Sequence, residues 1–395
     1  MSFRTKIIER NVGLKVFNQK KKWSESINAQ PMFNVLALAN QREKLGNYVA
    51  RMEIGDTPGF QNNSMNKTLL KYSQEPHRYS PSKGEPFLID VLFETQWKQF
   101  SRSDYDISIA PANFLIMAAL AAVTSRGDTV MIPDPGFPTY QLACDFLGLK
   151  TISYSLYPSD NNNFPEVNFA KKNFRHLPTA IIVNNPSNPL GFAYDGNQVS
   201  NAINSLTAQG VKLIIDETYI NLVYDTTQPL IPAKDAIRIR TFSKEHCAPG
   251  LRIGYVLASH DYSKTIADFI SLTISCMPRF IQMAVAEYLS TNEGTLFQQS
   301  IIKEMKQRYE MLFRMMPVNS ILSQPNSAFY ALIETGDCDR SFDFFLERNV
   351  ATCPGTKFGA AASTALRISI AGKIENLNKD FELLQHAYVD WTNRL

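Results

Sequence analysis

Lys244 belongs to a short segment whose residue types could hold an aldehyde cofactor. It ends the sequence Thr241-Phe242-Ser243-Lys244, and Arg252 follows in Gly250-Leu251-Arg252-Ile253-Gly254. A lysine amine can form a Schiff base with an aldehyde, whereas a threonine hydroxyl and an arginine fork can bind the oxygens of a phosphate. One lysine among 40 basic residues would carry no information by itself. The clustering of an amine, a hydroxyl and a guanidinium directly after the apolar run 236–240 predicts a site.

Such residues need a scaffold, and the pattern from about Tyr79 to about Arg279 predicts one. Short β-rich runs alternate with helical stretches there, and the runs that indicate strands are 106–109, 128–132, 179–183, 211–215 and 236–240. Continuous apolar runs predict a mostly parallel sheet with helices on both faces. Ligands bind beyond the carboxyl ends of strands in such sheets. Polar residues follow several of these strands and should converge at that edge: Asp134, Asn184, Asp216 and Lys244.

The composition is that of an ordinary globular protein. With 395 residues, 44% of them hydrophobic and 19% charged, the chain is long enough for two domains. A net charge of +3 gives no argument for a nucleic-acid or lipid partner, and the most apolar stretch, 115–123, is too short to span a bilayer. The five cysteines show no paired spacing, and the first residues lack the apolar core of a signal peptide. We therefore expect a cytoplasmic protein without a metal site.

Three segments resemble, in the family's order, the class I/II aminotransferases, which are fold-type I pyridoxal-phosphate enzymes. Residues 185–191 read N-P-S-N-P-L-G, close to the family's N-P-x-N-P-T-G turn. Residues 216–219 read D-E-T-Y and match D-E-x-Y, and residues 241–255 resemble the cofactor-lysine signature. The resemblance extends over nearly the whole chain from about Gln30.

The resemblance implies a two-domain protein of the α/β class. Its central sheet would be seven-stranded and mostly parallel, with helices on both faces, beside a smaller α+β domain. The large domain would span 61–285, and the small domain would combine 1–60 with 286–395. Strands are expected in the small domain at 329–333 and 366–370. The N-terminal segment has no partner strands of its own and should fold back on this C-terminal part.

Residues of these motifs would bind the cofactor ring by resemblance. Lys244 would form the Schiff base, and Asp216 would keep the pyridine nitrogen protonated, so that the ring can accept electrons. Asn188 and Tyr219 would reach the ring oxygen. Glu217 is the competing carboxylate, but neighbouring strand residues point to opposite sides and only Asp216 stands at the acidic position of the motif.

Further residues would contact the ring face and the phosphate. Phe137 lies in a sequence that resembles D-P-x-[YF]-P-x-Y, whose aromatic residue stacks on the ring. Thr241 and Arg252 would bind the phosphate, together with backbone amides of Ala110 and Ala112 at a helix start. This loop is atypical, because it reads I-A-P-A-N where relatives often have a Ser/Thr-Gly-small run. Some aspartate-specific relatives carry a lysine near Ala112, and its absence here weakens an assignment to aspartate.

The substrate and the partner subunit would be contacted by residues further away. Arg367 would form a fork on the substrate α-carboxylate, although an arginine between apolar residues could instead form a structural ion pair. Asn188 would contact the substrate as well, and Gly55 would mark the segment that closes over it. Tyr79 resembles a tyrosine that touches the phosphate of the neighbouring subunit, although by itself it is an aromatic residue before a turn. It implies a homodimer with shared active sites.

Two residues near the motifs depart from the usual pattern. His246, two positions after the lysine, could be a second acid/base group, since histidine titrates near neutrality, or it could be a packing substitution. Arg279 could bind a distal substrate carboxylate or lie at the subunit interface.

The implied function is that of a pyridoxal-phosphate-dependent aminotransferase, which moves an amino group between an amino acid and a 2-oxo acid. Lys244, once freed from the cofactor, would be the general base and acid at the substrate α-carbon. A lyase, replacement or cyclase enzyme of specialised amino-acid biosynthesis is the alternative, because fold alone does not fix the reaction. A non-catalytic regulator would need a fused nucleic-acid-binding module, for which the stretch before Gln30 is too short.

Overall fold

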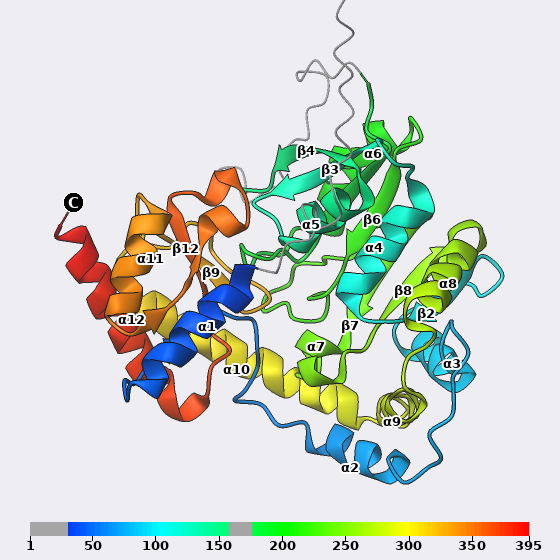
Figure 1. Ribbon diagram of the computed structural model, residues 1–395, viewed down its shortest axis with the longest axis horizontal. Coiled ribbons are helices and arrows are strands. Elements are labelled where there is room, and N and C mark those ends of the chain that lie inside the picture. The colour runs from blue at the N-terminus through cyan, green and yellow to red at the C-terminus, as the bar shows by residue number, and fades with distance from the viewer. Residues whose placement is uncertain (1–30, 158–175, 395) are drawn as a thin grey trace, which may run out of the picture.

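A seven-stranded sheet forms the centre of the protein. The computed structural model describes residues 31–157 and 176–394 (Figure 1). The strand order is β2-β8-β7-β6-β5-β3-β4, and within this sheet only β8 runs antiparallel to its neighbours. The bounds are β2 Tyr105–Ile109, β3 Thr129–Asp134, β4 Lys150–Ser155, β5 Ala180–Asn184, β6 Lys212–Asp216, β7 Ala236–Thr241 and β8 Gly254–Ser259. The predicted α/β class with a mostly parallel central sheet is confirmed.

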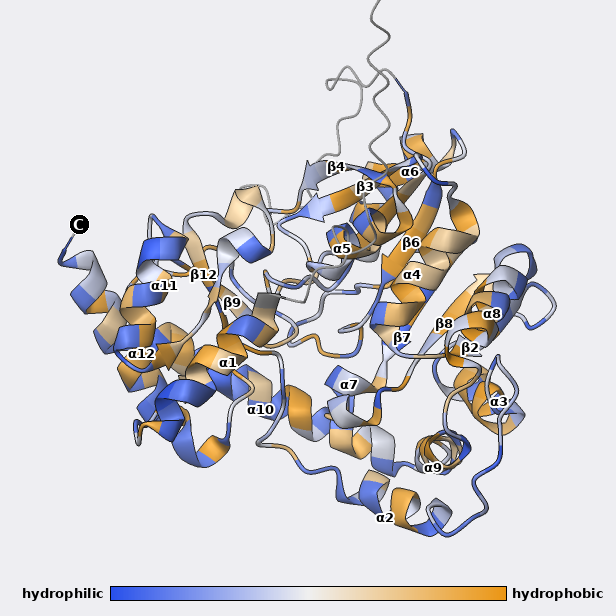
Figure 2. Ribbon diagram, in the orientation of Figure 1, coloured by the Kyte–Doolittle hydropathy of each residue, from blue (hydrophilic) through white to orange (hydrophobic). Residues whose placement is uncertain are grey.

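Helices cover both faces of this sheet, because successive strand residues point to opposite faces. Ile182 and Ile214 pack on one face, and their neighbours Ile181 and Leu213 pack on the other. The first face is covered by α4 (Ala112–Val123), α5 (Thr139–Leu147) and α8 (His260–Ile274), the second by α3 (Pro86–Thr95), α6 (Gly196–Thr207) and α9 (Arg279–Leu289). Helix α4 and strands β6 and β8 carry mostly hydrophobic colours in Figure 2, as expected for a sheet buried between two helical layers.

A smaller part of the protein is built on a second sheet. Strands β11 (Cys353–Pro354), β12 (Ala365–Ser369) and β9 (Tyr330–Glu334) form an antiparallel sheet in that order. The helices α1 (Pro31–Lys44), α11 (Cys338–Glu347) and α12 (Leu377–Thr392) lie around it (Figure 1). The two predicted strands are present, each shifted by one residue.

The N-terminal segment joins this smaller part. Strand β1 (Ala50–Arg51) pairs in parallel with β10 (Val350–Ala351), and Met52 donates its amide hydrogen to the Ala351 carbonyl at 3.0 Å. The segment therefore folds back on the C-terminal part, as expected. The predicted bounds of the two domains, 61–285 and 1–60 with 286–395, stay a prediction. Residues 1–30 lie outside the described residues.

One long helix connects the two parts. Helix α10 (Glu293–Met315) follows α9 and buries Met305 and Leu312 in the core of the smaller part. Helix α2 (Asn63–Tyr72) packs beside α9 at the other end (Figure 1). The remaining helices are short: α7 Phe242–Glu245 and the one-turn helices Pro249–Leu251, Gly355–Lys357, Ala360–Ala362 and Ile374–Asn376. Within the described ranges, no helix combines the length and the apolar character that crossing a bilayer demands.

Candidate active site

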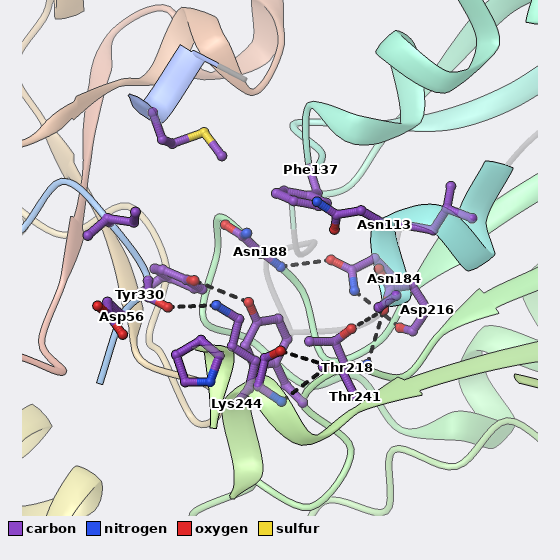
Figure 3. A pocket seen from close by; sticks show the side chains of 18 of the residues that line it. Asp56, Asn113, Phe137, Asn184, Asn188, Asp216, Thr218, Thr241, Lys244 and Tyr330 are labelled. Carbon is purple, nitrogen blue, oxygen red and sulfur yellow. Dashed lines mark hydrogen bonds between the residues drawn. The ribbon is translucent and has the colours of Figure 1, made fainter. Parts of the chain in front are cut away.

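A cavity of about 540 Å³ lies at the carboxyl ends of β5, β6 and β7, between the central sheet and the smaller part (Figure 3). This is the edge at which the sequence predicted a site. Ten of the predicted site residues line it: Gly55, Ala112, Phe137, Asn188, Asp216, Tyr219, Thr241, Lys244, Arg252 and Arg367.

Lys244 lies on α7, the single helical turn that follows β7. Thr241 begins this turn, and its hydroxyl accepts a hydrogen bond from the Ser243 amide at 3.1 Å. The Lys244 side chain crosses the cavity, and its Nζ donates to the carbonyl of Gly55 at 2.6 Å (Figure 3). The reactive amine therefore connects the large part of the protein to the N-terminal segment.

Asp216 ends β6 and is buried at the floor of the cavity. The Tyr140 hydroxyl donates to its Oδ2 at 2.7 Å, and the Thr218 hydroxyl donates to its Oδ1 at 2.6 Å. Burial raises the pKa of the Asp216 carboxyl, and these two hydrogen bonds oppose that shift. A buried carboxylate with fixed donors on both oxygens is a suitable partner for a protonated ring nitrogen.

Glu217 points away from the cavity, as predicted for the neighbour of Asp216. Its carboxylate bridges two buried guanidinium groups, those of Arg238 and Arg240, with an Arg240 Nε–Oε2 distance of 2.7 Å. Burial alone would raise the pKa of Glu217, but the two arginines hold it below its usual value. Glu217 therefore belongs to a buried ion cluster, and Asp216 is the carboxylate at the site.

Tyr219 and Tyr330 stand together beside the lysine. Their hydroxyl groups are 3.2 Å apart, and the burial of Tyr219 raises its pKa well above the ordinary value for a tyrosine. A Cβ atom at Gly55 would lie 1.7 Å from the Tyr330 hydroxyl oxygen. A side chain at this position would therefore have to displace Tyr330 or the N-terminal segment.

Asn188 is held by the turn that the sequence singled out. Its backbone amide donates to Oδ1 of Asn184 at 2.8 Å. The side-chain nitrogen of Asn184 in turn donates to the carbonyls of Pro186 and Asp216 at 3.0 and 3.1 Å. The turn thus positions the Asn188 side chain relative to the end of β6, which carries Asp216 (Figure 3).

Arg367 comes from β12 of the smaller part and is buried on the cavity wall. Its guanidinium lies between the rings of Tyr330 and Phe358, 4.5 and 4.7 Å from their centroids. It donates to the Glu53 carbonyl at 2.5 Å and to Asn188 Oδ1 at 3.4 Å, whereas its Nε is buried without a hydrogen-bond partner in the described structure. Within the described residues no carboxylate forms an ion pair with Arg367, which speaks against the structural alternative.

One end of the cavity offers groups that suit a phosphate. Arg252 has a left-handed backbone and an exposed side chain, which is hydrogen-bonded to the Pro249 carbonyl at 2.8 Å. Helix α4 begins here, and its first amides, at Ala112 and Asn113, have no intrahelical acceptor. A Cβ atom at Gly254 would lie 3.2 Å from the Ala112 nitrogen, so glycine permits this close approach. These groups fit the phosphate of the implied cofactor.

Two residues that the sequence placed at the site lie elsewhere, and a third, Tyr79, was expected at the site of the partner subunit and not at its own. Ala110 is buried and does not line the cavity, because its amide donates to the Gly254 carbonyl at 3.1 Å. Asp134 accepts a hydrogen bond from the Ala361 amide at 3.0 Å, so it does not converge with the other polar groups. Tyr79 is 90% exposed and lies outside the cavity.

The two atypical residues also lie outside the cavity. His246 is buried, and its Nδ1 is 3.1 Å from the Tyr288 hydroxyl while its ring packs near Phe242. This placement corresponds to the packing alternative. Arg279 forms ion pairs with Glu75 at 2.6 Å and with Glu85 at 3.7 Å.

Several residues of the cavity wall were not predicted. Tyr140 and Thr218 lie inside motifs that were recognised, at positions that received no role. Tyr330 lies on a predicted strand, but nothing in its local sequence marks it as part of a site. The other unpredicted residues include Met32, Phe33, Ile54 and Asn113, whereas Asn184 lines the cavity as expected from its position after a strand.

Comparison with known proteins agrees with this geometry. The family model "Aminotransferase class I and II" matches residues 62–381. A probable aspartate aminotransferase of Methanocaldococcus jannaschii is 25% identical over 330 residues, which cover 78% of this chain and 85% of the relative. A (5-formylfuran-3-yl)methyl phosphate transaminase of the same organism is 26% identical over 367 residues, which cover 90% of this chain and 95% of the relative.

A solved structure of similar shape confirms the fold. A double mutant of the Thermus thermophilus aspartate aminotransferase superimposes with a TM-score of 0.83 at 22% identity, covering 93% of this chain and 99% of that one. The expected fold and the expected aminotransferase activity are confirmed by these findings taken together. Because the family model matches most of its length, the chain belongs to the class I and II aminotransferase family.

Proposed function

We propose that the protein uses pyridoxal 5′-phosphate to move an amino group between an amino acid and a 2-oxo acid. The observation that carries the proposal is the presence of Lys244, Asp216 and Arg367 in one cavity. When bound, pyridoxal phosphate supplies an aldehyde for an amine and a ring that accepts electrons from the substrate α-carbon.

The cavity residues divide into groups that would hold different parts of the cofactor. Lys244 would bind the aldehyde carbon, and Asp216 would bind the ring nitrogen. Tyr219 and Asn188 would hydrogen-bond the ring oxygen, and Phe137, which stands on the cavity wall in Figure 3, would cover the ring face.

The phosphate would be bound at the start of α4. The exposed guanidinium of Arg252 and the amides of Ala112 and Asn113 are the donors that we assign to it. The Thr241 hydroxyl donates to the Ile253 carbonyl at 3.1 Å and would have to turn away from it to join them. Ala110 is left out of this set, because its amide already has an acceptor.

Arg367 and Lys244 would act on the substrate. The unpaired Nε of Arg367 and its fixed guanidinium plane suit the α-carboxylate. The Lys244 amine would accept the proton from the substrate α-carbon and return it to the cofactor carbon that carried the aldehyde. The segment around Gly55, already hydrogen-bonded to this amine, would exclude water from the reacting atoms.

We also propose a homodimer in which each subunit completes the other's site. Tyr79 is 90% exposed and lies outside the cavity of its own chain. Its hydroxyl would reach the phosphate bound by the partner. We place the protein in the cytoplasm, which agrees with five cysteines that all lie within the described ranges and form no disulfide.

Spectroscopy of the cofactor-loaded protein tests the reaction. We would titrate it with single amino acids, without any keto acid, and record its near-ultraviolet and visible absorbance. Recovery of one keto acid and one pyridoxamine phosphate per active site would support transamination. Product formed while the cofactor stays an aldehyde would overturn it in favour of elimination, replacement or cyclisation.

A lysine variant provides the control for this experiment. Lys244→Ala should lose covalent cofactor attachment and turnover. Lys264→Ala removes an exposed lysine that pairs with Asp268 on α8 and should leave both unchanged. Turnover that persists in Lys244→Ala would exclude the proposed role of this residue.

A further inference from the structure

The cations of the cavity already have partners assigned to them. The charged residues on its wall are Asp56, Asp216, Lys244, Arg252 and Arg367. Lys244 takes the aldehyde carbon, Arg252 the phosphate and Arg367 the substrate α-carboxylate. Among the lining residues in the described ranges, no cation is left for a second substrate carboxylate. Within one subunit, a distal carboxylate placed in the cavity would therefore lose hydration without gaining a charged partner.

The wall next to the N-terminal segment is apolar instead. Met32 and Phe33, in the first turn of α1, and Ile54, beside Gly55, line the cavity. Phe33 is 57% exposed and Ile54 is partly exposed, so both present surface that a bound side chain could cover. Covering apolar surface removes it from water, which stabilises a complex. This wall therefore favours a substrate side chain without charge.

Asp56 adds an unfavourable charge for acidic substrates. It lines the cavity beside Gly55, its side chain is exposed, and its Oδ1 accepts a hydrogen bond from the Thr57 amide at 2.8 Å. In Figure 3 it lies next to Tyr330. Within the described ranges it forms no ion pair. An unpaired carboxylate on the wall repels a second carboxylate brought into the same cavity.

We propose that the side-chain subsite accepts uncharged, apolar amino acids, with Met32, Phe33 and Ile54 as its wall, and that Asp56 excludes dicarboxylic amino acids. This inference rests on the proposed aminotransferase function, because it places the α-carboxylate on Arg367. It names a substrate class that differs from the aspartate of several relatives.

Two measurements on the cofactor-loaded protein test the inference. The first is the second-order rate of the half-reaction with L-leucine, L-methionine, L-phenylalanine, L-aspartate and L-glutamate. We expect at least one apolar donor to react about tenfold faster than either acidic donor. The second is calorimetric binding of two carboxylates without an amino group, 4-methylpentanoate and succinate, of which the former should bind more tightly.

A variant of the acidic residue isolates its contribution. Asp56→Asn keeps a side-chain oxygen for the Thr57 amide and removes the charge. We expect it to raise the rate with L-glutamate and the affinity for succinate by about tenfold, with a smaller change for L-leucine. Asp343→Asn, an equivalent change on the exposed side of α11, should alter neither.

The outcomes separate this inference from the function on which it rests. If L-aspartate or L-glutamate reacts fastest and succinate binds more tightly, the aminotransferase function stands and the apolar subsite is wrong. If Asp56→Asn changes acidic and apolar donors equally, Asp56 does not select the substrate. If no amino acid converts the cofactor, while the aldehyde remains bound to Lys244, the proposed function and the inference both fail.

Discussion

Two adjacent carboxylates of this protein have different tasks. Asp216 faces the cavity and accepts hydrogen bonds from two neutral hydroxyl groups, whereas Glu217 faces the opposite side and neutralises Arg238 and Arg240. Burial raises the pKa of Asp216, but the two arginines hold the pKa of Glu217 below its usual value. The sequence motif assigned the site to Asp216, and the charges around each side chain agree with that assignment.

Neutral isosteres of the two residues should therefore have opposite effects. Asp216→Asn should leave the free energy of unfolding nearly unchanged and remove most of kcat, because the ring nitrogen loses its carboxylate. Glu217→Gln should leave two buried guanidinium groups without a counter-charge and lower the free energy of unfolding by about 3–5 kcal/mol. Chemical denaturation and the half-reaction rate, measured on both variants, check this contrast. The reverse pattern would mean that the assignment of the two carboxylates is wrong.

At the scale of elements, the N-terminal segment between β1 and α2 closes one side of the cavity. Gly55 is essential to its path, because a Cβ atom there would lie 1.7 Å from the Tyr330 hydroxyl oxygen. Gly55→Ala should displace Tyr330 or the segment and lower kcat/KM, with overpacking costing about 1–3 kcal/mol. The double variant Gly55→Ala/Tyr330→Phe removes the clashing oxygen and should recover part of the loss. A double-mutant cycle on kcat/KM measures this coupling, and simple additivity would contradict the steric explanation.

Helix α12 carries a titrating group that should make stability depend on pH. Burial raises the pKa of the Asp380 carboxyl from 3.8 to about 6, against the opposing effect of the Tyr48 hydroxyl, which donates to it at 2.6 Å. Between these two pKa values the folded protein binds more protons than the unfolded chain. The contribution of Asp380 to the free energy of unfolding should therefore fall as pH rises from about 4 to about 6 and stay constant above that.

The Asp380→Asn variant checks this sign, since asparagine still accepts a hydrogen bond from Tyr48 but does not titrate in this range. Relative to the unmodified protein, the variant should gain stability when the pH is raised from about 4 to about 7. Thermal unfolding across this range measures the difference. A difference that is independent of pH would show that Asp380 has an ordinary pKa.

At the scale of the whole molecule, the proposed dimer predicts complementation between two inactive proteins. Lys244→Ala lacks the reactive amine of its own site, and Tyr79→Ala lacks the group that it would lend to its partner. In a mixed dimer, one site would combine an intact Lys244 with an intact Tyr79. Refolding equal amounts of the two together should restore about one quarter of the unmodified activity, because about half of the dimers are mixed and each has one complete site. Activity no higher than the mean of the two separate variants would contradict shared sites.

The sequence predicted the site best where functional residues stand in contiguous motifs. Asp216 ends a strand, Lys244 and Asn188 lie in the turns just beyond strand ends, and the edge of a parallel sheet brings such positions together. The same rule misplaced Asp134, because the end of a strand fixes a position and not the direction of a side chain, which here turns to the Ala361 amide. Ala110 was misplaced for a similar reason, since its amide completes a hydrogen bond to Gly254.

The unpredicted residues depend on how the two parts of the protein dock. Tyr330, Ile54 and Met32 reach the cavity only because the N-terminal segment pairs with β10 and the smaller part packs against the large one. No periodicity or spacing in their local sequence signals this contact. No run was singled out for β4 or for β8, the antiparallel strand, so the count of seven strands came from the family resemblance.

Dissolved salt should screen the charge of Arg252 more strongly than that of Arg367, because the two side chains have different surroundings. Arg367 lies buried between two aromatic rings, so dissolved ions cannot approach its charge closely. Arg252 is exposed, and its field is screened within about 8 Å at physiological ionic strength. Added salt should therefore weaken retention of the phosphate group well before it raises the KM for the amino acid. The protein would lose its cofactor in concentrated salt while its affinity for the substrate carboxylate remains.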